Sequence, residues 1–581
     1  MPDIHPRRVL VIGGGVAGLV TLRNLIKLGE QTGHFDRVEL VERRDDVGGV
    51  WYLDPEPRSS ASNLPPNDTA NGITNGTSRT PRWPSPAYPG LVGNVLPEYL
   101  SFSDYPPFPT PAQPADPFPT LAETHEYLKG FAASLSPGRI RLNTEVVRVM
   151  ENDALPSTND RVEDKDVSSA GPGWTVVLRD WNNGGEEREE VWDAIVSAVG
   201  YYDNPVWPDV PGMNEVRAAG LAEHAQAYRG PQGLEGKRVL VIGNANSSND
   251  IATHAAPIAQ TPVFRSIRRP ALFTFPSLPD SRIKDVAPVR EYEVVEGEDG
   301  RKQVRATLTD GTVIDHIDAV RVGTGYRPSP NFIHVRSRAP GDARSGTLTP
   351  LMHPPPAPHR IPALHRHILY APNPSLAFNG SAMSYTPFTI ADVTSAWLAL
   401  AWSGEVAYPE GVEERLESER ERLRGIEEAR AREAEEALRR AAQVGAAQRE
   451  GGPNDAEAPS SDGAIETSDG EPLDTKDIAA KDANGTAAVA VTTAWTSGPS
   501  DFLSYNIFGP FEQGYAAGLR ADIVRARPEL DKVLPEWNAE RTKKRETMYA
   551  LKFRSLEWAR NRREAARVQH NVKDEPTAST P

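Results

Sequence analysis

The sequence predicts an α/β protein with two dinucleotide-binding domains, the second inserted into the first. The same order of elements, a buried strand, a glycine-containing turn and a helix, starts at Val9 and again about 230 residues later at Val239. Two further segments complete the prediction: a disordered acidic insertion at 451–500 and a helical C-terminal end at 501–581.

Composition excludes several classes of protein. The 581 residues include 64 basic and 80 acidic side chains, and the net charge of −16 argues against a nucleic-acid partner. The chain has no cysteine, which excludes disulfides, cysteine-ligated metals, cysteine nucleophiles and dithiol redox chemistry. It has no run of about 18 apolar residues and no pattern of a signal peptide, so we expect no membrane span and a cytoplasmic location.

The first turn has the GxGxxG spacing of a nucleotide-binding turn. The first glycine permits a tight turn, the second lets the backbone approach a pyrophosphate, and the third lets the helix pack against the strand. Glu42 follows the second predicted strand, and a carboxylate there accepts hydrogen bonds from ribose hydroxyls and repels a 2′-phosphate, so this site suits FAD or NAD. The residues expected to bind this cofactor are Gly13, Gly14, Gly15, Val16, Ala17, Gly18 and Glu42.

A glycine pair shortly after Glu42 extends the first site. Gly48 and Gly49 allow the backbone to approach a bound flavin, since neither has a side chain. The alternative is a plain turn beside a core tryptophan. From this stretch we expect contacts to the cofactor from Gly49, Val50 and Trp51.

The second turn starts at Gly243, but Ala245 and Ser248 stand where further glycines are expected. Serines at a helix N-terminus can bind phosphate or cap the helix. After the next strand, a hydroxyl and two guanidinium groups replace the carboxylate of the first site, which matches the 2′-phosphate of NADPH; the alternative is a surface arginine pair. The expected contacts are Gly243, Ser247, Ser248, Asp250, Ser266, Arg268 and Arg269.

Together with these turns, further motifs resemble one family, the flavin-containing monooxygenases, most closely the soluble fungal type. Residues 218–228 fit the family's FxGxxxHxxxY fingerprint at Gly220, His224 and Tyr228, with Ala218 in place of phenylalanine. Residues 88–97 look like the block around the active-site asparagine, which would be Asn94. Two later segments also resemble the family: Gly323, Thr324 and Gly325, where the chain returns between domains, and Pro387, Phe388 and Asp392 in the late flavin-side segment.

The resemblance implies an enzyme, an FAD-dependent NADPH monooxygenase, with Asn94 as its catalytic residue. It implies oxygenation of soft nucleophilic nitrogen or sulfur with O₂ through a C4a-hydroperoxyflavin, in the manner of an N,N-dimethylaniline monooxygenase. The expected partners are therefore O₂ and a small-molecule amine or thioether. The oligomeric state stays open, with a homodimer as one option.

The motifs divide the chain into successive segments. Residues 412–442 are dense in Glu and Arg and predict one exposed charged helix, with a coiled coil as the alternative. The expected boundaries are 1–205 and 323–411 for the FAD domain, 206–322 for the NADP domain, 412–450 for the charged helix, 451–500 for the acidic linker and 501–581 for a helical segment packed on the FAD domain.

Other functions remain open at this point. One is a Baeyer–Villiger or N-hydroxylating flavin monooxygenase. Another is a non-catalytic nucleotide-binding relative, because Gly93, Ala218, Ala245 and Thr394 depart from the family's pattern. No metal site is expected, because the four nearby histidines lie in a proline-rich stretch that indicates a loop: His353, His359, His365 and His367.

Overall fold

The structure is a computed structural model that describes most of the chain. The described residues are 5–53, 83, 85–153, 173–268, 277–297, 300–338, 346–352, 360–450 and 504–573. The predicted acidic insertion at 451–500 lies outside them, as do Arg269, His353 and His359.

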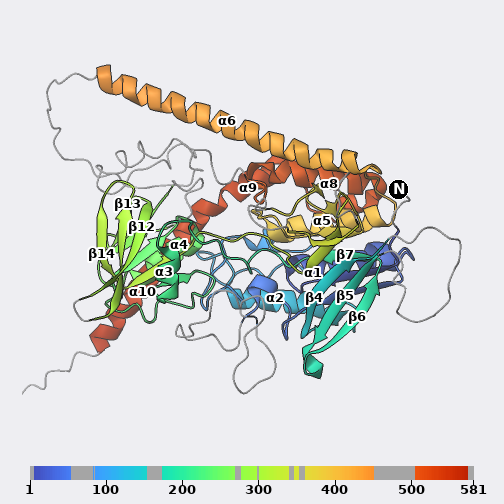
Figure 1. Cartoon of the computed structure of the whole chain (residues 1–581), viewed down its shortest axis with the longest axis horizontal. Helices are drawn as coiled ribbons and strands as arrows, with labels where there is room; N and C mark the ends of the chain where they lie inside the picture. Colours follow the sequence, from blue (N-terminus) through green and yellow to red (C-terminus); the bar gives the residue numbers. More distant parts are fainter. Residues whose placement is uncertain are drawn as a thin grey trace, which may run out of the picture.

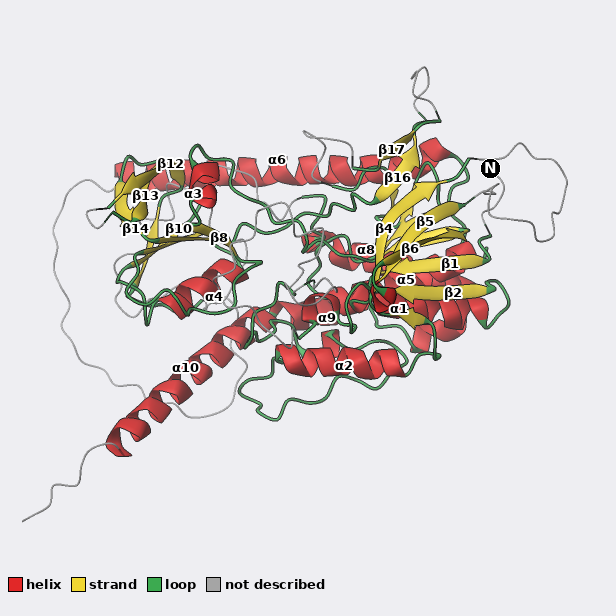
Figure 2. Cartoon of the chain, turned by 60° about the horizontal axis from the view of Figure 1, so that its bottom comes forward, coloured by secondary structure: helices red, strands yellow, loops and turns green. Residues whose placement is uncertain are grey.

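A seven-stranded sheet forms the centre of the first domain (Figures 1 and 2). In spatial order its strands are β18 (Leu364–His365), β19 (Leu369–Tyr370), β20 (Leu376–Phe378), β7 (Ala194–Ser197), β1 (Arg8–Ile12), β2 (Arg37–Val41) and β3 (Ile140–Arg141). The five strands from β20 to β3 run parallel. Strands of this sheet are almost fully apolar, as expected for a sheet covered on both faces.

Helices cover one face of this sheet. Val9 and Val11 of β1 point to this side and pack with α1 (Val16–Leu25) and α5 (Pro387–Trp402). Every residue of α5 after Pro387 is buried, which fits its mostly apolar sequence. Further out lies α2 (Leu121–Ala133), which begins with a capping box between Thr120 and Glu123.

A second sheet covers the opposite face. Leu10 and Ile12 of β1 point to this side and pack against the buried Trp174 and Trp192. The sheet is mostly antiparallel, and its strands in spatial order are β17 (Leu348–Pro350), β16 (Ile333–Arg336), β4 (Thr144–Glu151), β5 (Trp174–Asp180) and β6 (Glu186–Trp192).

The second domain repeats the parallel plan. Its five parallel strands in spatial order are β11 (Ile283–Val286), β10 (Val263–Ser266), β9 (Val239–Ile242), β15 (Ala319–Val322) and β8 (Ala222–His224). One face packs against α4 (Asn246–Ala255). The other packs against the short helix α3 (Met213–Ala218) and an antiparallel sheet of β12 (Val289–Glu296), β13 (Lys302–Leu308) and β14 (Val313–Ile317).

Both sheets of the second domain lie, in sequence, between β7 and β16 of the first. The chain therefore leaves the first domain, builds the second and returns. This confirms the predicted α/β fold class with one dinucleotide-binding domain inserted into another.

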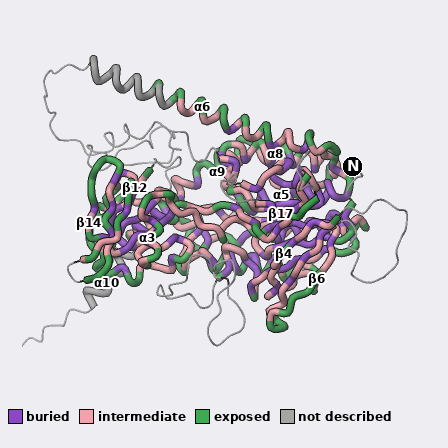
Figure 3. Tube along the Cα trace, viewed as in Figure 1, coloured by how far each residue is buried: buried purple, intermediate pink, exposed green. Residues whose placement is uncertain are grey.

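The charged segment forms α6 (Val412–Glu450), a single long helix that extends from the first domain toward the second (Figure 1). Much of the helix is exposed as expected, but one side of its first turns, with Arg415 and Glu419, is buried (Figure 3). Arg415 is 1% exposed, and its guanidinium donates to the carbonyl oxygens of Ala371, Pro409 and Glu410 at 2.7–2.8 Å. Arg415 thus docks this end of the helix through hydrogen bonds from two of its guanidinium nitrogens to backbone carbonyls.

Three helices follow near the C-terminus. The first, α8 (Glu512–Ala526), packs on α5 through Ala516, Leu519 and Ile523. The others are α9 (Ala539–Glu546) and α10 (Met548–Lys573). In Figures 1 and 2, α10 runs from α9 to the second domain and passes beside α4.

Candidate functional site

The carboxyl ends of both parallel sheets open onto one cleft between the two domains. Its volume is about 2520 Å³. Residues after β1 and β2 line one side, residues after β9 and β10 line the opposite side, and the first turns of α10 form a third wall. In α/β proteins ligands bind outside the carboxyl ends of the strands, so this cleft is the candidate active site.

The first turn has the backbone that its glycines predict. Gly13 has a φ of +106°, and a Cβ there would lie 2.8 Å from the carbonyl oxygen of Ala198. A Cβ at Gly18 would overlap the carbonyl oxygen of Gly13, so α1 approaches the turn only because residue 18 has no side chain. Of the predicted residues, Gly13, Gly15, Val16 and Ala17 line the cleft, whereas Gly14 and Gly18 are buried behind it.

Glu42 directly follows β2 and lines the cleft with a side chain that is 5% exposed. Its Oε2 accepts a hydrogen bond from the Gly14 N–H at 2.6 Å, and its Oε1 accepts one from the Arg44 N–H at 2.9 Å. These bonds fix the carboxylate at the turn, and each oxygen retains a lone pair for another donor. This arrangement fits two ribose hydroxyls.

The predicted glycine pair packs backbone to backbone on the first turn. The Gly48 N–H donates to the Gly14 carbonyl oxygen at 2.9 Å. A Cβ at Gly15 would lie 3.3 Å from the Cα of Gly49, and a Cβ at Gly49 would lie 2.8 Å from the Cα of Gly15. Val50 and Trp51 continue from this contact along the cleft.

Arg44 supports the glycine pair, and sequence reasoning missed it. Its guanidinium donates to the carbonyl oxygens of Gly49 at 3.1 Å and Trp83 at 2.6 Å. Burial lowers the pKa of Arg44, and the Glu42 carboxylate opposes this shift. The position of Arg44 in the sequence, between Glu42 and the glycine pair, is the pattern that could have predicted this role.

The first turn and its neighbours fit the dinucleotide part of FAD. The N-cap residue Gly15 has no side chain to cap α1, and the helix starts at the cleft with Val16 and Ala17 lining it. Glu42 supplies the ribose acceptor, and a side chain at Gly15 would fill the space between the turn and Gly49.

The second turn repeats the backbone with different side chains. Gly243 has a φ of +120°, and a Cβ there would lie 2.6 Å from the carbonyl oxygen of Gly323. Ser247 is exposed at the cleft, where its hydroxyl can bind phosphate. Ser248 is fully buried, and its hydroxyl accepts from the Ala245 N–H and donates to the Ala245 carbonyl, each at 2.9 Å. Of the two roles considered for Ser248, the structure shows the helix cap.

The hydrogen bonds of the two turns show which residue after β10 stands in the place of Glu42 after β2. The Gly13 N–H donates to Val41 and the Gly243 N–H to Ser266, so Ser266 corresponds to Val41. The counterpart of Glu42 is therefore Ile267. The Ser266 hydroxyl donates to the Ala287 carbonyl oxygen at 3.0 Å, and Arg268 lines the cleft.

Asp250 connects the second turn to the segment that precedes Asn94. Its Oδ2 accepts a hydrogen bond from the Tyr88 hydroxyl at 2.6 Å. The Tyr88 ring makes edge-on contacts with Tyr228 and His254, so the predicted fingerprint tyrosine also belongs to this junction. Burial raises the pKa of Asp250, and the bond from Tyr88 opposes the shift.

His224 lies where the chain passes between the domains. It is 4% exposed, its ring packs on Trp207 and Tyr326, and its Nδ1 accepts from the Gln226 N–H at 3.1 Å. Burial lowers the pKa of His224 to about 4, so the ring is neutral at pH 7. The predicted Thr324 and Gly325 lie in the second connection between the domains, and they pair with Val206 in the first. The Thr324 hydroxyl donates to the Val206 carbonyl oxygen, and the Val206 N–H donates to the Gly325 carbonyl oxygen at 2.9 Å.

Asn94 lines the cleft on a bend between the two domains. The preceding Gly93 N–H donates to the Pro119 carbonyl oxygen at 2.8 Å. Apolar residues near Asn94 in sequence also line the cleft: Leu91, Val92, Val95 and Leu100.

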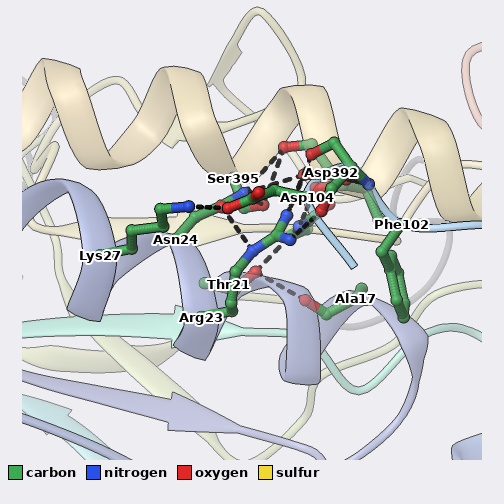
Figure 4. Close-up of polar contacts among 12 residues, drawn as sticks. Ala17, Thr21, Arg23, Asn24, Lys27, Phe102, Asp104, Asp392 and Ser395 are labelled. Atoms are coloured by element: carbon green, nitrogen blue, oxygen red, sulfur yellow. Dashed lines mark hydrogen bonds and ion pairs between the residues drawn. The ribbon is translucent and has the colours of Figure 1, made fainter. Parts of the chain in front are cut away.

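Asp392, expected in the flavin-side segment, points away from the cleft toward α1 (Figure 4). Its Oδ1 accepts from Arg23 at 2.6 Å and from Asn24 at 3.1 Å, and its Oδ2 accepts from the Ser103 N–H at 2.7 Å. This carboxylate therefore joins α5 to α1 and to the segment after the Asn94 loop.

The described part of the chain contains no group of three or more potential metal ligands. His365 belongs to β18 and is not in a loop, whereas His367 lies in the turn between β18 and β19; both side chains are buried. Within the same residues, no helix combines the length and apolarity of a membrane span.

Comparison with known proteins agrees with this geometry. The family described as flavin-binding monooxygenase-like matches residues 79–273, which include the Asn94 bend and the second turn. The flavin-containing monooxygenase FMO GS-OX3 of Arabidopsis thaliana is 27% identical over 413 residues, 70% of this chain and 76% of that protein. FMO GS-OX-like 1 of the same plant is 28% identical over 407 residues, 69% and 73% of the two chains.

Solved structures show the same fold. The S-allyl-L-cysteine S-oxygenase from Allium sativum superposes with a TM-score of 0.52 at 24% identity and covers 72% of this chain and 82% of its own. Tmm from a Pelagibacter species has a TM-score of 0.52 at 20% identity, with 72% and 80% covered. The chain is therefore similar to flavin-containing monooxygenases, and the matches support a flavin-dependent enzyme with FAD and NADPH as its cofactors.

Proposed function

We propose that the enzyme uses NADPH and O₂ to oxygenate a soft nucleophilic nitrogen or sulfur atom of a small molecule. One oxygen atom enters the substrate, the other leaves as water, and NADPH with a proton supplies the two electrons. The observation that carries the proposal is that one cleft contains both nucleotide turns and the Asn94 bend. The name of a relative, an S-oxygenase of a small thioether, favours this substrate class.

FAD would lie on the first turn and NADPH on the second. When bound, FAD supplies the redox chemistry with O₂. The residues proposed to hold it are Gly13, Gly14, Gly15, Val16, Ala17, Gly18, Glu42, Gly49, Val50, Trp51 and Asn94. Those proposed for NADPH are Gly243, Ser247, Asp250, Arg268, Gly323, Thr324 and Gly325, with Ser248 and Ser266 shaping the turn; Arg269 is proposed from sequence alone.

The chain's own contribution is to orient the nicotinamide and to exclude water. The Asn94 amide can donate and accept hydrogen bonds at the cleft, while the apolar residues around it leave water few partners. The Tyr88–Asp250 bond holds this segment to the second domain, so binding at the second turn and the position of Asn94 are mechanically linked.

Product analysis tests the proposal. The purified enzyme is incubated with NADPH, O₂ and, in turn, a thioether, a tertiary amine and a cyclic ketone. A sulfoxide or an N-oxide is the expected product. A lactone from the ketone as the main product would identify a Baeyer–Villiger enzyme, and absence of FAD after purification would contradict the proposal altogether.

A substitution tests the role of Asn94. Asn94→Ala should still oxidise NADPH, but it should release more H₂O₂ and less product. The reason is that the loss of one hydrogen bond, worth about 1–3 kcal/mol, weakens the protection of the bound cofactor from water. Asn331→Ala, an exposed asparagine at the cleft rim, is the matched control. Unchanged coupling of NADPH use to product in Asn94→Ala would show that Asn94 has no active-site role.

A further inference from the structure

We propose that Lys552 of α10 is a positioning residue that fixes the peptide leading into Asn94. The Lys552 ammonium donates to the Gly93 carbonyl oxygen at 2.7 Å, across 459 positions of sequence. Gly93 and Asn94 share that peptide, so the contact constrains the backbone on which the Asn94 side chain is mounted. The inference rests on the proposed function of Asn94.

Three residues on one face of α10 make polar contacts with the segments that surround Asn94. Met548, Lys552 and Ser555 are spaced four and three residues apart, so they share a face of the helix, and all three are buried. The Leu96 N–H donates to the Met548 sulfur at 3.5 Å, and the Ser555 hydroxyl donates to Asp116 at 2.7 Å. The helix therefore holds the bend on both sides of Asn94.

Gly93 is fixed from two directions. Its N–H donates to the Pro119 carbonyl oxygen at 2.8 Å, and its carbonyl accepts from Lys552. A Cβ at Gly93 would lie 3.2 Å from the same Pro119 oxygen, so this position also tolerates a side chain poorly. Loss of the Lys552 bond would free one of the two restraints on this peptide.

The surroundings of Lys552 suit a charged donor. Its side chain is 8% exposed, and its ammonium lies 4.8 Å from the centre of the Phe118 ring. Burial lowers the pKa of Lys552, while Asp250 and Asp116 oppose that shift. A charge-assisted bond to a carbonyl is among the stronger hydrogen bonds in a protein, which makes Lys552 the main polar restraint from α10.

Lys552→Met tests the proposal, since methionine keeps the apolar stem and removes the donor. Lys544→Met is the matched control: Lys544 lies in the neighbouring α9, outside the cleft, and forms an exposed ion pair with Glu98 at 2.6 Å. Amide hydrogen exchange of residues 91–97 is measured without substrate. We expect about tenfold faster exchange in Lys552→Met and no change in Lys544→Met.

Turnover supplies the second readout. Lys552→Met should bind FAD and oxidise NADPH at near wild-type rates, yet release several-fold more H₂O₂ per NADPH. A Lys552→Gln variant keeps a neutral N–H donor and should show smaller changes in both exchange and peroxide release. Unchanged exchange and unchanged coupling in Lys552→Met would overturn the proposal.

A double-mutant cycle separates positioning from direct substrate contact. If Lys552 acts through Asn94, the double variant with Asn94→Ala should be no more uncoupled than Asn94→Ala alone. Additive losses would overturn the positioning role and indicate that Lys552 binds the substrate. If Asn94→Ala leaves coupling intact while Lys552→Met accelerates exchange, the proposed role of Asn94 fails and the structural restraint by Lys552 stands.

Discussion

The two nucleotide turns of this chain, residues 13–18 and 243–248, share a backbone conformation at their first glycine and differ in sequence at the other five positions. In each, the first glycine has a positive φ and faces the carbonyl oxygen at the end of the neighbouring strand, Ala198 for Gly13 and Gly323 for Gly243. Each turn also donates from its first glycine to the end of the next strand. The backbone thus defines a dinucleotide site, and the remaining positions define which dinucleotide it suits.

At the sixth residue of the turn, Gly18 in the first and Ser248 in the second, the glycine needed for close packing lies on opposite sides of the contact. Gly18 has no room for a Cβ because the Gly13 carbonyl oxygen occupies that space. At the corresponding place Ser248 has a side chain, and the glycine is found opposite, since a Cβ at Gly323 would lie 2.9 Å from the Cβ of Ser248. Close packing of helix and strand ends therefore needs a small residue on one side of the contact only.

The largest effect is expected when Gly18 of the first turn is replaced by serine, the residue at the corresponding place in the second turn. Gly18→Ser places a Cβ on the Gly13 carbonyl and should destabilise the first domain by about 3 kcal/mol or more, with loss of FAD. Bound flavin and thermal unfolding report the effect. Gly514→Ala, at a helical glycine with open space around it, is the control and should be neutral or slightly stabilising. Normal flavin content in Gly18→Ser would contradict the packing argument.

Acid should weaken both regions through separate buried histidines. Burial lowers the pKa of His224 near the second turn and of His365 in the first sheet to about 4. Because the unfolded chain takes up a proton near pH 6.5 and the folded one does not, each contributes stability that is complete above pH 6.5 and falls toward pH 4, by about 3 kcal/mol at most.

The slope of unfolding free energy against pH checks this. His224→Asn and His365→Asn should each flatten the slope between pH 6.5 and 4, whatever their effect at pH 8. If the regions unfold as one unit, both variants change the same transition. A slope that neither variant alters would show that other groups cause the acid sensitivity.

The residues after the second strand should set the choice between NADPH and NADH. Arg268→Ala should raise the KM for NADPH by about 10- to 150-fold and leave NADH use nearly unchanged, because one charge-assisted pair with the 2′-phosphate is lost. Steady-state kinetics with both cofactors measure the ratio. Equal losses for NADPH and NADH would show that Arg268 does not contact that phosphate.

The smallest effect concerns Arg43, which stands after β2 at the position that Arg268 has after β10. Arg43 donates to both carboxylate oxygens of Asp203 at 2.8 Å and so interacts within the protein. Asp203→Asn should cost about 0.5–1 kcal/mol of stability and leave the NADPH preference unchanged. A change of preference as large as that of Arg268→Ala would remove the distinction between the two arginines.

The sequence was sufficient for the features that depend on neighbouring residues. The strand–turn–helix at Gly13, the position of Glu42 beside that turn and a helix from Val412 all follow from local spacing, and the structure contains each of them. Strand register was harder, because one residue decides which side chain corresponds to Glu42. We expected the Ser266 hydroxyl at that place, and the hydrogen bond from Gly243 assigns it to Ile267.

Long-range contacts could not be predicted from spacing. The guanidinium of Arg44 on the Gly49 carbonyl, the Tyr88–Asp250 bond and the docking of Arg415 each join segments whose proximity depends on the whole fold. His365 and His367 lie in a proline-rich stretch that indicated a loop, yet packing against α6 and the C-terminal residues buries both.

The position of α10 also has a consequence for biosynthesis. Chains are made from the N-terminus, so both nucleotide turns and Asn94 leave the ribosome long before Met548 and Lys552 exist. A chain that stops or is cut ahead of residue 548 retains every predicted cofactor contact and lacks the helix that holds the Asn94 bend. On the proposed roles of Asn94 and Lys552, such a fragment is expected to oxidise NADPH and to release more of the oxygen as hydrogen peroxide.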